Sequence, residues 1–104
     1  MLLVNIENIP GKEISEALGM VKGEIVQTKH IGRDFMAGMK TIVGGEVKSY
    51  TQMISEARTE ATRRMVEEAE RLGADAIVGV RYNSSEVMQG ASEIIAYGTA
   101  VKLR

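Results

Sequence analysis

The chain has 104 residues, with 13 Lys and Arg, 14 Asp and Glu, one His and no Cys. This length suits one domain over residues 1–104, and 44% hydrophobic with 26% charged residues is typical of a globular protein. A net charge of −1 argues against a nucleic-acid-binding protein with a broad basic face. The lack of cysteine excludes disulfides, zinc–thiolate sites and thiol catalysis.

The start of the chain is apolar but does not resemble a targeting segment. Met1 to Val4 lacks a preceding basic region, and Glu7 and Pro10 interrupt the apolar stretch that a secretory leader needs. No window approaches the ~18 apolar residues of a membrane-spanning helix. We therefore expect a cytoplasmic protein that binds neither membranes nor nucleic acid.

The first third of the chain predicts short elements. Residues 1–6 have the character of a short strand. Residues 12–18 are expected to form about two helical turns that end at Gly19. Residues 20–29 alternate apolar and polar side chains, which predicts a strand with one solvated face.

The middle of the chain predicts two helices. Asp34 is a plausible N-cap for a short helix over residues 34–43, and Gly44 and Gly45 are expected to form a turn after it. Residues 46–72 predict a long helix, with Gly73 as the left-handed residue that ends it. Its apolar positions step by three or four residues: Tyr50, Ile54, Ala57, Ala61, Met65, Ala69 and Leu72.

The last third predicts two strands joined by a polar loop. Residues 76–82 are almost continuously apolar, residues 83–92 are polar, and residues 93–103 alternate. We expect an antiparallel hairpin. The small residues Ala96, Gly98 and Ala100 share one face of the last strand, so the long helix is placed against that face. The resulting class is α+β, a small, mostly antiparallel sheet packed on one long helix with additional short helices.

The expected helix is long for so small a domain. At ~1.5 Å per residue it extends roughly 40 Å, whereas a compact domain of this size has a radius of gyration of ~13 Å. The chain also has more apolar surface than one helix covers. We therefore expect a homo-oligomer. A monomer whose short helix covers the remaining sheet face is the alternative.

Few residues stand out as candidates for chemistry. The N-terminal amides of the long helix, just after Gly44 and Gly45, are able to hold an anion, although a simple inter-helix turn explains the glycines as well. Arg81 lies within an apolar strand, where it either pairs with Glu93 across the hairpin or binds an anionic ligand. His30, the only histidine, makes no metal site with one carboxylate.

No sequence motif indicates an enzyme. The chain lacks a dinucleotide-binding glycine motif, a P-loop, a metalloprotease motif and a nucleophile elbow. Whether it is an enzyme stays open, and no cofactor is predicted.

A set of short motifs nevertheless connects the chain with a known family. They are Gly44-Gly45-Glu46, Tyr50-Thr51, Glu56-Ala57-Arg58, Met65, Leu72-Gly73-Ala74-Asp75-Ala76 and Ala96-Tyr97-Gly98-Thr99-Ala100-Val101. From about residue 9 to the C-terminus, the sequence resembles the YbjQ-like family, whose members carry a heavy-metal-binding label and have no assigned function.

This resemblance implies a subunit similar to the dodecin-like fold, assembled into a homopentamer. It also marks Glu46, Tyr50 and Thr51, which match the family motif, as a functional surface. The heavy-metal label fits this chain poorly, because one histidine and no cysteine leave a soft metal without its usual ligands.

Three functions follow as hypotheses. The first is an oligomeric binding protein of unknown ligand, with Gly44, Gly45, Glu46, Tyr50, Thr51 and Arg81 as candidate ligand-binding residues between subunits. The second is metal binding through oxygen ligands and His30. The third is a structural ring or scaffold without a ligand.

Overall fold

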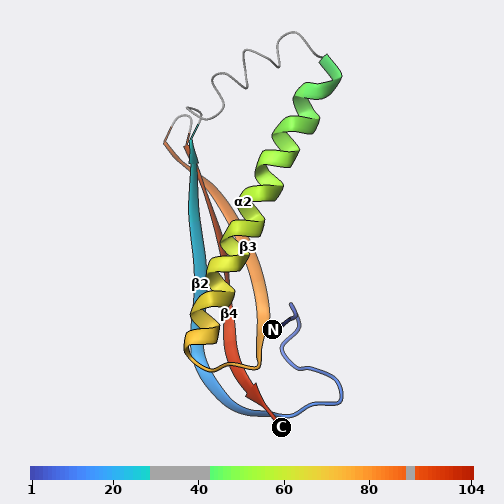
Figure 1. Ribbon diagram of the computed structural model, residues 1–104, viewed down its shortest axis with the longest axis vertical. Helices are drawn as coiled ribbons and strands as arrows, with labels where there is room; N and C mark the ends of the chain where they lie inside the picture. The colour runs from blue at the N-terminus through green and yellow to red at the C-terminus, as the bar shows by residue number, and fades with distance from the viewer. Residues whose placement is uncertain (29–42, 89–90) are drawn as a thin grey trace.

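The computed structural model describes residues 1–28, 43–88 and 91–104 of the chain. The described elements are β1 (Leu2–Leu3), β2 (Ile14–Thr28), α2 (Val43–Arg71), β3 (Ala76–Met88) and β4 (Ala91–Leu103). The strands form one sheet in the order β1-β3-β4-β2, and α2 runs along one face of it (Figure 1). β1 is parallel to β3, while the β3–β4 and β4–β2 pairs are antiparallel. The protein is therefore an α+β fold with a mixed, mostly antiparallel sheet.

The helix packs against the small-residue face of β4, as the sequence predicts. Ala61, Met65 and Ala69 of α2 are fully buried against Ala96 and Ala100 of β4. Alanine at these positions keeps side chains short, so the helix backbone approaches the sheet closely.

The two layers approach each other closely at Gly23 of β2. A Cβ atom built there would fall on the carbonyl oxygen of Ala61 and within 2.6 Å of the backbone nitrogen of Met65. Only glycine allows this contact, because the atoms that it meets belong to the helix backbone.

A bulge in β3 decides which side chains face the helix. Val78 pairs with Thr99 and Arg81 with Tyr97, so two residues of β3 lie opposite Gly98 alone. Gly79 accommodates this extra residue with a φ of 61°. Since side chains alternate along a strand, the extra residue turns Arg81 away from the helix and Tyr82 toward it.

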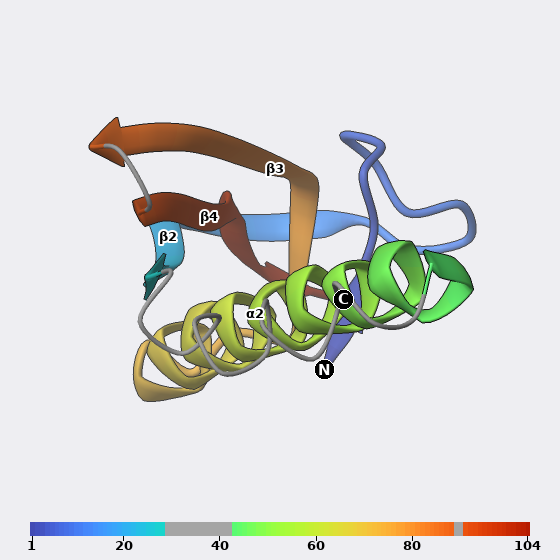
Figure 2. The same cartoon turned by 90° about the horizontal axis from the view of Figure 1, so that it is seen from above.

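The N-terminal segment covers part of the opposite sheet face. Ile9 packs with Ala76, Val78 and Val101 in a second, smaller cluster. Backbone hydrogen bonds along β3 hold this segment, and the last of them runs from the amide of Val80 to the carbonyl oxygen of Val4. The N-terminal segment thus protects β3 only up to Val80. Figure 2 shows this segment beside the first part of β3 and away from its far end.

Two elements predicted from the sequence are wrong. Residues 12–18 contain no helix, because the chain from Ile14 onward belongs to β2 and pairs with the end of β4. Residues 83–92 are not a polar loop, because β3 continues to Met88 and β4 begins at Ala91. Their polar character reflects solvent exposure on both faces of the strand, which local pattern alone does not distinguish from a loop.

Other boundaries differ from the expected ones. The long helix is confirmed and ends as predicted, with Gly73 at a φ of 78°. It starts at Val43, so Gly44 and Gly45 lie within its first turn and not in a turn before it. The first strand is reduced to Leu2–Leu3. The short helix predicted over residues 34–43 lies almost wholly outside the described residues.

The chain is elongated. Its radius of gyration is 17.0 Å and its principal extents are 55 × 24 × 18 Å, against ~13 Å for a compact domain of this length. The N-terminal half of α2 leans away from the sheet, as Figure 1 shows. Within the described residues, no helix combines the length and apolarity needed to cross a membrane.

Candidate functional site

The predicted site residues fall in two separate parts of the molecule. Gly44, Gly45, Glu46 and Tyr50 belong to the first turns of α2, and Thr51 follows them. Because the glycines are helical, any anion site at this helix end would use amides that precede Glu46. The sequence predicts that the helix begins at Glu46, which is about one turn after its observed start at Val43.

Thr51 lies in an open groove along the N-terminal half of α2. The groove has a volume of about 460 Å³ and is lined by Thr51, Gln52, Ser55, Glu56, Thr59 and Glu60. Each of these side chains carries a hydroxyl, amide or carboxylate group, and such groups suit a polar ligand or a hard cation. Of these residues, only Thr51 was predicted.

Arg81 lies on the sheet face opposite the helix. Its Nη1 donates hydrogen bonds to the carbonyl oxygens of Asn5, at 2.6 Å, and Val80, at 3.0 Å. The predicted pair with Glu93 is wrong, because β3 is longer than expected and the strand register places Ser85, not Arg81, beside Glu93. The guanidinium instead fastens the N-terminal segment to β3.

Arg81 and Thr51 do not meet within one chain. The Tyr82 hydroxyl oxygen lies 2.8 Å from Oγ1 of Thr62, which fixes the level of the helix beside this part of β3. Thr51 is about 16 Å further along the helix axis, at 1.5 Å per residue. The two parts of the predicted site are therefore separated by the sheet and by three helical turns.

A second groove, which the sequence prediction missed, is lined by side chains of the open sheet face together with Val21 of β2 and Glu68 of α2. Lys22, Tyr97 and Arg81 are register partners across β2, β4 and β3, so they share one row. The neighbouring groove has a volume of about 540 Å³ and is lined by Met20, Val21, Lys22, Glu68, Asn83, Ile95 and Tyr97. The alternation in β2 predicts the solvated face but not its partners on the other strands.

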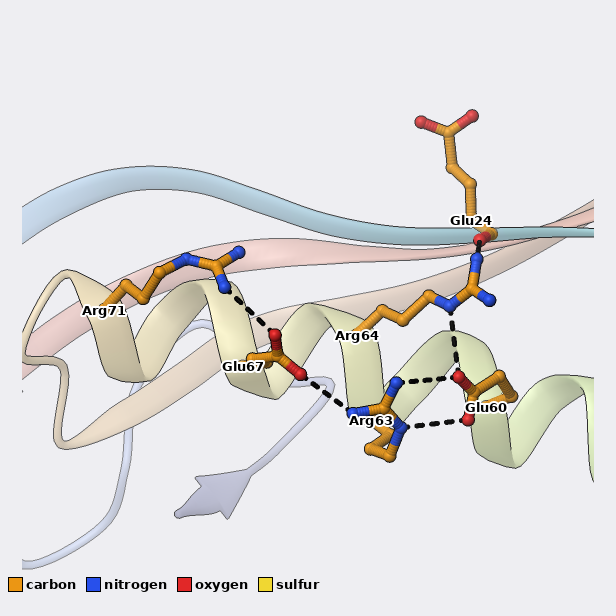
Figure 3. A network of polar contacts seen from close by, with 6 residues as sticks. All are labelled: Glu24, Glu60, Arg63, Arg64, Glu67 and Arg71. Carbon is orange, nitrogen blue, oxygen red and sulfur yellow. Dashed lines mark hydrogen bonds and ion pairs between the residues drawn. The ribbon is translucent and has the colours of Figure 1, made fainter.

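The exposed side of α2 carries a network of ion pairs (Figure 3). Arg63 contacts Glu60 and Glu67, each at 2.8 Å. Two i,i+4 pairs add to the network, Glu60–Arg64 at 3.1 Å and Glu67–Arg71 at 3.0 Å. Hydrogen bonds from Arg63, and to a smaller extent from Arg64, lower the pKa of Glu60 to about 2.

One residue of this network also reaches the sheet. Arg64 donates from Nη1 to the carbonyl oxygen of Glu24 at 2.6 Å, which joins α2 to β2. The Glu24 carboxylate forms an ion pair with Lys22 at 2.9 Å, and the hydrogen bond from Lys22 lowers the pKa of Glu24. The network thus has a structural role between the two layers.

The comparisons agree with this α+β architecture and identify the family. The chain matches over residues 1–104 the family model YbjQ, described as "Putative heavy-metal-binding", and it belongs to this family. A UPF0145 protein of Vibrio campbellii is 58% identical over 103 residues, which cover 99% of each chain. A UPF0145 protein of Thermosipho africanus is 57% identical over 104 residues, which cover 100% of this chain and 96% of the relative.

A solved structure supports the fold. The crystal structure of a protein of unknown function from Pediococcus pentosaceus, a member of the DUF74 family, aligns with a TM-score of 0.66 at 18% identity. The alignment covers 100% of this chain and 98% of that one.

The described residues do not fit the heavy-metal description. Nowhere in residues 1–28, 43–88 and 91–104 do three or more His, Asp or Glu side chains gather as a metal would require. Glu60 and Glu67 are both held by arginines. His30 lies outside the described residues, so the ligand set predicted around it stays a prediction.

Proposed function

We propose that the protein is a homo-oligomeric binding protein whose ligand lies between subunits. One observation carries the oligomeric part: the last eight residues of β3, Arg81–Met88, are all exposed. They include Tyr82, Val87 and Met88, which are 45%, 52% and 67% exposed. Among the described residues, little besides the contact of Tyr82 with Thr62 covers this strand, and exposed apolar side chains of this kind form a surface that association buries.

The positions of the candidate residues support a site shared by subunits. Thr51 and Arg81 are too far apart to contact one small ligand within a chain, and they lie on opposite sides of the sheet. Two neighbouring subunits can bring the N-terminal turns of α2 from one toward Arg81 of the other. The proposed ligand-binding set is Gly44, Gly45, Glu46, Tyr50, Thr51 and Arg81.

The family resemblance supports a homopentamer of subunits similar to the dodecin-like fold. Mass measurement in solution, by light scattering across a range of protein concentrations, tests this directly. A mass of five chains is expected. A chain that stays monomeric at all concentrations would overturn both the assembly and the site between subunits.

Ligand binding is tested with anions, because Arg81 and the helix amides favour negative charge. We expect inorganic phosphate or a small dicarboxylate to raise the midpoint of thermal unfolding, as any ligand specific for the folded state does. Arg81→Ala and Glu46→Ala should change that shift, whereas the control Arg104→Ala, at the chain end, should not. Equal shifts in all four proteins would contradict the assigned residues.

Metal binding through oxygen ligands and His30 is the second candidate, supported by the description of the family. Elemental analysis of untagged protein, with His30→Ala as the matched variant, tests it. About one metal per chain, lost in the variant, would support this function, and a well-folded sample with far less metal would exclude it. An assembled protein that binds neither anions nor metals would support a structural ring.

A further inference from the structure

Two strand edges of the sheet have no strand beside them in the described chain. β2 is the terminal strand of the sheet and pairs only with β4 over its 15 residues. β3 has β1 and the N-terminal segment beside it only up to Val80. From Arg81 to Met88 it pairs with β4 alone. Long unpaired edges of this kind readily pair with another chain.

The outward backbone groups on each edge can be identified by alternation. In an antiparallel pair, successive residues direct their amide and carbonyl groups to opposite sides. The amide of Val80 points outward, since it donates to the carbonyl oxygen of Val4. By alternation, the backbone amide and carbonyl groups of Tyr82, Ser84 and Glu86 also point outward. The carbonyl of Glu24 points outward, since it accepts from Arg64, and the backbone groups of Lys22 and Val26 do likewise by alternation. Pairing at this edge requires Arg64 to share or release the Glu24 carbonyl.

These two edges are complementary in direction. β3 and β2 are both antiparallel to β4, so they run the same way through the sheet. When a second copy continues the sheet in the same orientation, its β3 edge lies parallel to the β2 edge of the first. Each subunit then uses both of its free edges, whereas pairing of two identical edges about a twofold axis would leave the other edge bare.

We propose that β2 of one subunit pairs in parallel with residues 81–88 of β3 in a second copy of the same chain. The proposal rests on the homo-oligomer proposed above and specifies how its subunits join. Head-to-tail contacts of this kind build a ring when the rotation between subunits closes.

Charge selects the register between the two strands. Without stagger, Arg81 would continue the row of Lys22 and Tyr97 and come to lie beside Lys22 of the partner subunit, which places two cations together. A shift of two residues keeps all side chains on the same face and brings Arg81 beside Glu24 of the partner subunit. Closed sheets require such a stagger, so we assign this register.

This pairing completes the groove on the open sheet face. The groove of one subunit ends at the β3 edge with Asn83, and the partner subunit would supply the next wall from its β2. Arg81 then lies at the boundary between two subunits. Its contribution to ligand binding then depends on assembly.

The experiment uses cysteine pairs, because the natural chain contains no cysteine. In the proposed register, Asn83 lies beside Val26 of the partner subunit, with both side chains on the open face. A chain carrying Asn83→Cys and Val26→Cys is oxidised with a mild oxidant and run on a denaturing gel without reductant. We expect a ladder of covalent oligomers, because each chain bonds to both neighbours.

Three control proteins make the result specific. Asn83→Cys alone and Val26→Cys alone should stay monomeric on the gel. The pair Asn83→Cys with Lys22→Cys should cross-link much less, since Lys22 is displaced by four residues in the proposed register. Cross-linking by either single variant would indicate pairing about a twofold axis and would overturn the proposal.

The solution mass of each variant before oxidation separates this proposal from the one on which it rests. If the cysteine-pair variant has the same oligomeric mass as the natural protein but forms no covalent oligomers on the gel, the strand pairing is overturned and the proposed oligomer stays intact. Monomers in the natural protein would overturn both. Oligomers that form the ladder only with the cysteine pair at residues 83 and 26 support both.

Discussion

The two ends of the molecule differ in how completely the sheet is covered. At the closed end, around Met65, Ala69 and Ala76–Val80, the helix packs on one face and the N-terminal segment packs on the other. At the open end, which comprises Arg81–Met88 and the helix from Thr51 to Thr59, the strand is exposed and the helix leans away (Figure 1).

This difference separates the parts of the chain that a single subunit stabilises from those that it does not. Burial of apolar surface at the closed end is sufficient to define the layers, the bulge at Gly79 and the helix position. The open end contains the groove along α2 and the unpaired part of β3, whereas the second groove and the β2 edge extend along both ends. We expect mutations at the closed end to change the stability of the subunit and those at the open end to change association.

The largest expected effect comes from a pair of methionines, one at each end. Met65 is fully buried, so Met65→Ala should lower the free energy of unfolding by about 3 kcal/mol through lost contacts and a cavity. Met88 is 67% exposed, so Met88→Ala should change it by less than about 0.5 kcal/mol while weakening the assembly. Urea titration and solution mass measure the two quantities. Equal loss of subunit stability in both variants would contradict the comparison.

The next effect concerns the layer contact at Gly23. Gly23→Ala should destabilise the fold by roughly 2–3 kcal/mol, because the added methyl group meets the backbone of Ala61 and Met65, which can yield only if the helix moves. Gly98→Ala is the matched control. Its new methyl group would lie 2.8 Å from Cγ2 of Ile77 and 3.0 Å from the carbonyl oxygen of Val78, both further away than the helix backbone atoms that a methyl group would meet at Gly23, so a smaller loss is expected. A greater loss for Gly98→Ala would show that the helix tolerates displacement.

A hydrogen bond at the boundary between the two ends should contribute less. Tyr82→Phe removes the contact with Thr62 and should cost about 0.5–1 kcal/mol, since both side chains are solvent-accessible. A double-mutant cycle with Thr62→Ala isolates this pair from the bond that Thr62 also donates to the carbonyl oxygen of Arg58. A coupling energy of zero would mean that the two side chains do not hold the helix to β3.

The sequence predicts the regular elements well and the irregular strands poorly, for physical reasons. The long helix and the last strand follow one period, so the buried face of the helix was identified correctly from Ala57 to Ala69, although Leu72 is 45% exposed. In β2, the register shifts between Ala17 and Gly19, and this irregularity interrupts the two-residue period. Ile14, Ala17 and Leu18 consequently match helical spacing although they lie in a strand.

The candidate site shows the same limit. Thr51 was selected because it matches the family motif, and it lies in the groove along α2. Arg81 was selected as an isolated charge in an apolar strand, and it lies where the unpaired part of β3 begins. Their separation depends on the bulge at Gly79, which no local pattern of residue types reveals, and on the length of β3. The groove lined by Lys22, Asn83 and Tyr97 depends on strand register, which is a property of three strands together.

The smallest expected effect is a pH dependence from the network on α2. Glu60 has a pKa of about 2 in the folded chain, against 4.5 when it is unperturbed. A carboxyl group whose pKa is lowered by folding stabilises the folded state above its unfolded pKa and loses that contribution as the pH falls. Stability should therefore decline between about pH 4.5 and pH 2. The decline should be modest, because the arginine partners are solvent-exposed.

Thermal unfolding midpoints from pH 6 to pH 2, compared between the natural chain and Glu60→Gln, measure this contribution. The variant should show a shallower decline but not a flat one, because the pKa values of Glu24 and Glu67 are lowered as well. Added salt should reduce the difference between the two proteins, since it screens exposed ion pairs. Parallel curves would show that the network contributes nothing to the subunit. The contrast between the two ends would then rest on apolar packing alone.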